Sequence, residues 1–126
     1  MCDELIIGVG QNSEKNYLFS LDERMKFILE THNKEPKIKV LSFQGLTINF
    51  CKDVNATAIV RGLRNPADFE FEKSVAQTNR RLSGIETLFL LTAADFSYIS
   101  SSIVREIIFH KGDYSSLVPE AVKNSR

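Results

Sequence analysis

The stretch IVRGLRNPADFEFE, from Ile59 to Glu72, joins a predicted buried strand to a predicted helix. The small and β-branched residues around its start favour a strand over Ala56–Val60. Asn65 and Pro66 favour a helix start, because asparagine caps free backbone N–H groups and proline fits the first helical position. The stretch therefore predicts a strand followed closely by a helix, as in an α/β protein.

Two arginines, Arg61 and Arg64, lie between this strand and this helix. They either pair with carboxylates of the helix, for which Asp68, Glu70 and Glu72 are the candidates, or bind an anionic ligand. The residues alone give the two interpretations about equal weight. The predicted place of the arginines, in a loop after a strand, favours the ligand.

Three further apolar runs predict strands, and longer amphipathic patterns predict helices between them. The expected strands are Glu4–Val9, Ile38–Phe43 and Glu86–Leu91, and the expected helices cover 20–32, 46–55 and 65–83, begin within 97–107, and include a short one opened by Pro119. Ser20 and Glu23 have the spacing of a capping box. The helix that starts at Asn65 is expected to bury Ala67, Phe71 and Val75 and to stop at Gly84.

Alternation of apolar strands and helices predicts a single α/β domain over residues 1–126, with a parallel sheet and helices on both of its faces. Ligands of such sheets bind beyond the carboxyl ends of the strands. The loops at that edge hold Lys15, Thr47, Arg61, Arg64 and 100–102, the last a run of three serines. Cations, hydroxyls and helix N-termini together favour anions, so a phosphate-rich ligand is expected.

The charge balance limits the possible partners. Sixteen basic residues offset sixteen acidic ones, so there is no net field to attract nucleic acid or an anionic membrane. Cys2 and Cys51 stand far apart, outside any cluster typical of metal ligands, and are expected to be ordinary thiols. No apolar run approaches the roughly 20 residues that span a bilayer. We expect a cytoplasmic protein with no protein-bound metal site.

Several motifs resemble the bacterial phosphopantetheine adenylyltransferase family. They are the segment Ile59–Glu72, then Gln77-Thr78-Asn79-Arg80, then SYISSSIVRE over 97–106. Lys15 and the turn His110–Asp113 also fit. The resemblance covers essentially all 126 residues, and the combination is much more specific than the RGLR sequence alone.

The resemblance implies a Rossmann-like, three-layer nucleotidyltransferase that transfers AMP from ATP to 4′-phosphopantetheine. The products are dephospho-coenzyme A and pyrophosphate, formed by direct in-line attack without a covalent enzyme intermediate. It also implies dependence on Mg²⁺, which accompanies ATP, a homo-oligomer that is generally a hexamer, and binding of dephospho-coenzyme A or coenzyme A as product or inhibitor.

The resemblance also implies roles for individual residues. Lys15 and Arg64 are the implied catalytic residues, with Lys15 contacting phosphates of both substrates. The implied phosphopantetheine site consists of Lys15, Leu46, Thr47 and Arg61, with Arg61 on the phosphate. The implied ATP site consists of Gly62, Arg64, Glu72, Tyr98, Ile99, Ser100, Ser101 and Ser102, with Glu72 on the ribose, and Gly10 lines the same pocket.

Members of this family begin with a strand, a glycine-rich loop and a T-x-G-H motif that opens a helix. These are not among the 126 residues, and the alignment puts Met1 near the end of that helix. We therefore expect the sequence to lack roughly 25 residues, judged from typical element lengths. The motif's histidine is implied to stabilise the transferred phosphoryl group, and His32 and His110 are not expected to replace it.

Two other functions remain open. A chain without the T-x-G-H segment could be a catalytically silent module that binds a nucleotide or coenzyme A. A related nucleotidyltransferase with another phosphate-bearing acceptor, such as nicotinamide mononucleotide, is the second alternative. The RGLR and ISSS sequences argue against that acceptor.

Overall fold

A computed structural model describes residues 2–12 and 17–123 of the chain, which divides into two compact units. The first unit comprises Met1–Gly45 and Ser101–Arg126, and the second unit comprises Leu46–Ser100. Each unit contains one pair of parallel strands, so the expected α/β class with parallel strands is confirmed. The four strands form two separate two-stranded sheets within the described residues.

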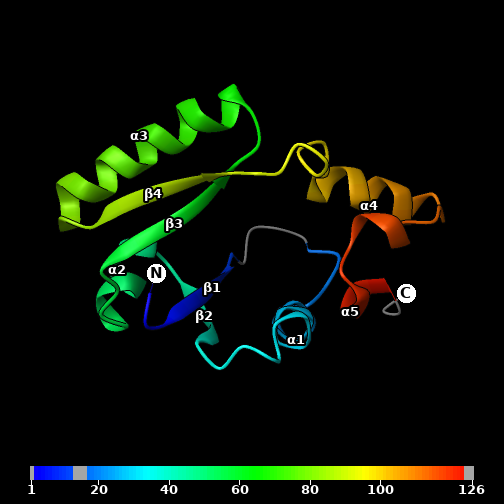
Figure 1. The fold of residues 1–126 in the computed structure, drawn as a ribbon, viewed down its shortest axis with the longest axis horizontal. Helices are drawn as coiled ribbons and strands as arrows, with labels where there is room; N and C mark the ends of the chain where they lie inside the picture. Colours follow the sequence, from blue (N-terminus) through cyan, green and yellow to red (C-terminus); the bar gives the residue numbers. More distant parts are fainter. Residues whose placement is uncertain (1, 13–16, 124–126) are drawn as a thin grey trace. The chain divides into compact units, whose positions relative to one another are not determined.

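The first unit is built on strands β1 (Leu5–Gln11) and β2 (Ile38–Gln44), which helix α1 (Leu21–Thr31) connects (Figure 1). The strands pair in register from Leu5 opposite Ile38 to Gln11 opposite Gln44. Helix α1 packs against both strands. The chain returns to this unit as α4 (Ser101–Phe109), a 3₁₀ turn η1 (Ser115–Leu117) and α5 (Glu120–Lys123), which packs on α1.

The predicted capping box at the start of α1 is confirmed. The Ser20 hydroxyl accepts a hydrogen bond from the backbone N–H of Glu23 at 3.1 Å, and the Glu23 carboxylate accepts one from the backbone N–H of Ser20 at 3.1 Å. Both donors are among the first backbone N–H groups of the helix, which have no hydrogen-bond partner within the helix itself. The start of α1 is thus set by local sequence.

The second unit holds α2 (Thr47–Asp53), β3 (Ala58–Leu63), α3 (Pro66–Ser83) and β4 (Glu86–Leu91). Strands β3 and β4 pair in parallel, and α3 is the crossover helix that packs against both (Figure 1). One more hydrogen bond, from the N–H of Thr92 to the carbonyl of Leu63 at 2.8 Å, extends the ladder. The carboxyl ends of both strands therefore lie at one edge of this sheet.

Helix α3 begins and ends where the sequence predicts. The side-chain oxygen of Asn65 accepts a hydrogen bond from the N–H of Asp68 at 2.9 Å, and Pro66 occupies the first turn. At the other end Gly84 adopts φ 77°, and its N–H donates to the carbonyl of Arg80 at 2.8 Å. This left-handed conformation costs glycine little and explains why the helix stops there.

Two predictions about the second unit are wrong. Strand β3 runs from Ala58 to Leu63 rather than from Ala56 to Val60, because its ladder with β4 continues three residues further. Arg61 and Gly62 therefore lie within the strand. In α3, Ala67, Phe71 and Val75 are exposed, Phe71 to 70%, whereas the less exposed positions are Asp68, Glu72, Ala76, Asn79 and Ser83.

Candidate functional site

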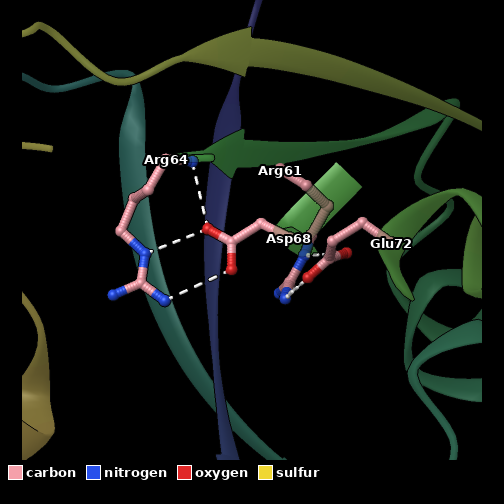
Figure 2. A network of polar contacts seen from close by, with 4 residues as sticks. All are labelled: Arg61, Arg64, Asp68 and Glu72. Atoms are coloured by element: carbon pink, nitrogen blue, oxygen red, sulfur yellow. Dashed lines mark hydrogen bonds and ion pairs between the residues drawn. The ribbon is translucent and has the colours of Figure 1, made fainter. Parts of the chain in front are cut away.

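Arg61 and Glu72 form a two-point ion pair between β3 and α3. The Nε of Arg61 donates to Oε2 of Glu72 at 3.0 Å, and its Nη2 donates to Oε1 at 2.6 Å (Figure 2). The Glu72 side chain is 13% exposed and that of Arg61 56%. These hydrogen bonds raise the pKa of Arg61 above its ordinary value, since they favour the charged guanidinium.

Arg64, directly after β3, makes the same kind of pair with Asp68. The Asp68 carboxylate accepts hydrogen bonds from Nε of Arg64 at 3.0 Å and from Nη2 at 3.3 Å, and from the backbone N–H of Arg64 at 3.1 Å (Figure 2). The guanidinium, followed by the backbone N–H, lowers the pKa of Asp68, and the pKa of Arg64 is raised. The pairing that the sequence left open is therefore present for both arginines.

A pocket of about 130 Å³ opens in the second unit between α3 and the β3–β4 sheet. Its lining residues are Thr47, Ile59, Arg61, Phe71, Glu72, Val75, Ala76, Asn79 and Thr87. Ile59 and Arg61 reach the same pocket because side chains two residues apart in a strand share a face. Three residues expected at the site, Thr47, Arg61 and Glu72, are thus brought together.

Two polar pocket residues were missing from the predicted site. Asn79 lies within the Gln77–Arg80 motif and on the less exposed side of α3, so its position in the motif was the available signal. Thr87 lies on β4 opposite Ile59. Its hydroxyl is buried without a hydrogen-bond partner within the described part of the chain. A threonine in an apolar strand gave no signal, because the residue is common in strands.

The remaining predicted residues belong to several elements of the two units. In the second unit, Leu46 precedes α2, Gly62 lies in β3, and Tyr98, Ile99 and Ser100 follow β4. In the first unit, Ser101 and Ser102 open α4, and Gly10 lies near the carboxyl end of β1. Lys15 lies outside the described residues.

The two histidines have local roles. The N–H of His32 donates to the carbonyl of Ile28 at 3.1 Å and caps the end of α1. The Nε2 of His110 lies 3.0 Å from Oε1 of Glu106, just after α4. Neither histidine lines the pocket in the second unit.

Other possible binding features are few over residues 2–12 and 17–123. No group of three or more histidine, cysteine, aspartate or glutamate side chains within these ranges could hold a metal ion. No helix there is long and apolar enough to cross a membrane. Cys2 is exposed and Cys51 buried, both are free thiols, and burial raises the pKa of Cys51. Within the described residues, the Arg61–Glu72 pair is the charged part of the pocket lining, and the Arg64–Asp68 pair is not part of that lining.

A comparison with protein families agrees with this description. Residues 1–107 match the family model described as cytidylyltransferase-like. The parallel α/β units, the arginines at the end of β3 and this match define a nucleotidyltransferase of the Rossmann-like class.

Curated relatives narrow the class further. Proteins named phosphopantetheine adenylyltransferase from Flavobacterium psychrophilum, Flavobacterium johnsoniae and Bacteroides thetaiotaomicron are 64%, 60% and 43% identical to this chain over 121 residues. Each alignment covers 96% of this chain and 80% of the relative. The chain belongs to the phosphopantetheine adenylyltransferase family, and the family resemblance is confirmed.

Proposed function

We propose that this chain transfers AMP from ATP to 4′-phosphopantetheine, giving dephospho-coenzyme A and pyrophosphate in coenzyme A biosynthesis. The proposal rests on two arginines, Arg61 and Arg64, which lie on one short segment of this chain and each hold a carboxylate. The chain also belongs to a family with this activity in its name. The reaction joins two phosphate-bearing substrates, and each needs a cation to hold it. Arginine suits both, because its planar fork matches phosphate oxygens.

In the proposed reaction an oxygen of the acceptor phosphate attacks the α-phosphorus of ATP. A new phosphorus–oxygen bond forms as the bond between the α-phosphorus and the bridging oxygen breaks, and pyrophosphate leaves with the electron pair. Arg61 holds the acceptor phosphate, and Arg64 holds phosphates of ATP. Catalysis of this kind depends on positioning and on stabilising negative charge, so no general base is required of the site.

The pocket in the second unit suits the pantetheine arm. Arg61 and Glu72 make one part of its lining polar, and Ile59, Val75 and Ala76 make another part apolar. Pantetheine is a chain of amides and methylene groups, which needs both kinds of surface. Thr47 at the pocket supplies a hydroxyl for an amide, as the family resemblance implies, with Leu46 beside it.

Mg²⁺ is proposed to enter with ATP. Mg²⁺ prefers octahedral oxygen coordination, keeps several waters and binds largely through substrate phosphates. The two carboxylates nearest the proposed phosphate positions, Asp68 and Glu72, are held by arginines. Because both carboxylates are occupied by arginines, the site fits an Mg²⁺ ion that the nucleotide carries and that neutralises phosphate charge.

The test is pyrophosphate release from the protein with ATP, 4′-phosphopantetheine and Mg²⁺. The proposal expects pyrophosphate and dephospho-coenzyme A in equal amounts, with none when the acceptor is omitted. Binding of both substrates without turnover would favour the alternative, a silent module that binds nucleotide or coenzyme A. Turnover with nicotinamide mononucleotide in place of 4′-phosphopantetheine would identify a different acceptor.

The setting of the reaction is also proposed. The family resemblance supports a hexamer that works in the cytoplasm and is bound by coenzyme A or dephospho-coenzyme A as inhibitor or product. Exposed apolar side chains in the second unit, among them Phe71, Leu82 and Leu91, support association of subunits. Sedimentation equilibrium measures the subunit number, and competition between coenzyme A and 4′-phosphopantetheine tests the inhibitor.

A further inference from the structure

We propose that Glu72 and Asp68 are positioning residues, each of which holds one edge of its arginine and leaves the other edge for a substrate phosphate. Glu72 then acts on the acceptor through Arg61, and Asp68 acts on ATP through Arg64. The inference rests on the proposed function for the identity of the two substrates. The contacts themselves come from β3, α3 and the short connection between them.

The hydrogen-bond pattern is the same in both pairs. Each carboxylate accepts from the Nε and the Nη2 of its arginine. A guanidinium has five N–H groups, so this arrangement leaves three, two on Nη1 and one on Nη2. In neither arginine do these three groups have a hydrogen-bond partner among the described residues. The Nη1–Nη2 edge can therefore hold a phosphate while the carboxylate stays in place.

In each pair the side chain of the acidic residue is less exposed than that of the arginine. The Glu72 side chain is 13% exposed against 56% for Arg61, and Asp68 is 25% exposed against 40% for Arg64. Asp68 is further fixed by its place in the first turn of α3, where its N–H donates to Asn65. The carboxylates thus anchor the arginines, and the open part of each pair is the cationic end.

This geometry gives Glu72 a different task from the ribose contact that the family resemblance implies. Both oxygens of Glu72 already accept hydrogen bonds from Arg61, at 2.6 and 3.0 Å. A ribose hydroxyl would have to compete with a charge-assisted bidentate contact. If Glu72 positions Arg61, removal of its carboxylate weakens binding of the acceptor. If Glu72 contacts the ribose, the same change weakens binding of ATP.

Two double-mutant cycles on the full chain test this difference. Binding of 4′-phosphopantetheine alone and of ATP with Mg²⁺ alone is measured by calorimetry for Glu72→Gln, Arg61→Ala and the double variant, and for Asp68→Asn, Arg64→Ala and their double variant. Glu72→Gln is expected to raise the Kd for the acceptor about tenfold, within the range of coupling between contacting residues, and to leave the Kd for ATP unchanged. Asp68→Asn is expected to do the reverse.

The double variants separate positioning from a general effect on the fold. If Glu72 acts only through Arg61, Glu72→Gln causes no further loss in the Arg61→Ala background. The matched control is Glu70→Gln, on the same helix, because the Glu70 carboxylate has no hydrogen-bond or ion-pair partner in the described residues. It makes the same change of charge and is expected to leave both Kd values unchanged.

A measurement on the wild-type protein covers the case in which a variant does not fold. In ¹⁵N spectra of the arginine side chains, the Nε–H of Arg61 is expected to stay protected from exchange when 4′-phosphopantetheine is added. Release of that N–H would overturn the inference, as would a Glu72→Gln variant that loses affinity for ATP alone. Failure of the wild-type protein to bind 4′-phosphopantetheine would instead overturn the proposed function itself, whereas the two results above overturn only the positioning role and leave the proposed function in place.

Discussion

The side-chain oxygen of Asn65 accepts the backbone N–H of Asp68 at 2.9 Å, and the carboxylate of Asp68 holds Arg64. One turn of α3 therefore serves two purposes, since the residue that starts the helix also fixes the carboxylate beside the proposed ATP arginine. Stability of the helix and placement of Arg64 are linked through these contacts.

Asn65→Ala is expected to lower the free energy of unfolding by about 1 kcal/mol, as loss of an N-cap usually does. It should also weaken ATP binding more than binding of 4′-phosphopantetheine, because Asp68 loses its hydrogen bond to residue 65 whereas the Arg61–Glu72 pair keeps its contacts. Urea unfolding and calorimetry measure the two effects. Asn65→Ser keeps a capping oxygen and is the matched control, and a stability of Asn65→Ala equal to that of the wild type would contradict the cap.

Acid should weaken the fold through Asp68 in a defined direction. Its pKa is lowered in the folded protein by the guanidinium and then by the backbone N–H of Arg64. A carboxyl with a lowered folded pKa stabilises the fold above its unfolded pKa of about 3.9, and this contribution is lost as pH falls through the folded pKa. The stability difference between wild type and Asp68→Asn should therefore be constant near neutral pH and disappear in strong acid.

Asp113 provides a comparison far from the arginines in sequence. Its pKa is also lowered, because its carboxylate accepts the N–H of Ser115 at 3.0 Å. Asp113→Asn should show the same pH pattern of stability in acid titrations followed by circular dichroism, but should leave ATP affinity at neutral pH unchanged. If Asp68→Asn also leaves ATP affinity unchanged, the link between Asp68 and the ATP site is contradicted.

The features that the sequence predicts correctly are local ones. The capping box of Ser20 and Glu23, the cap at Asn65 and the stop at Gly84 each depend on residues within one helical turn. The short segment that carries the arginines also follows from this, because a strand and a helix start fall within a few residues of each other. Arg61 lies near the end of β3, and Arg64 lies in the connection to α3. A cationic site at the carboxyl end of β3 was therefore predictable.

The inward side of α3 was not predictable, because it depends on a contact across the second unit. The spacing of Ala67, Phe71 and Val75 favours an apolar side, yet Asp68 and Glu72 are the less exposed residues. The arginine pairs explain this, since Arg61 in β3 holds the Glu72 carboxylate and Arg64 holds that of Asp68 through charge-assisted hydrogen bonds. The extent of β3 has a similar cause, because pairing with β4 extends it past Val60.

Gly84→Ala should lower the free energy of unfolding by about 1 kcal/mol, since a left-handed conformation costs an ordinary residue about that much. Gly84 has φ 77°, and a Cβ there would meet no atom within 4 Å, so the whole cost is conformational. Thermal or urea unfolding measures it. Gly62→Ala is the comparison, because Gly62 lies in β3 without a positive φ and should not lose stability. Equal losses for the two variants would show that the left-handed conformation of Gly84 is not the cause.

Arg61→Ala should raise the Kd for 4′-phosphopantetheine about tenfold or more, since a hydrogen bond to a charged group contributes roughly 1.5–3 kcal/mol. The Kd for ATP should change much less, because Arg64 keeps its pair with Asp68. Arg61→Lys should recover little of the acceptor affinity, since an ammonium cannot contact Glu72 and a phosphate through two separate edges. Arg64→Ala is the matched control with the opposite expected pattern. Equal losses of both substrates in Arg61→Ala would show that the two arginines do not divide the substrates between them.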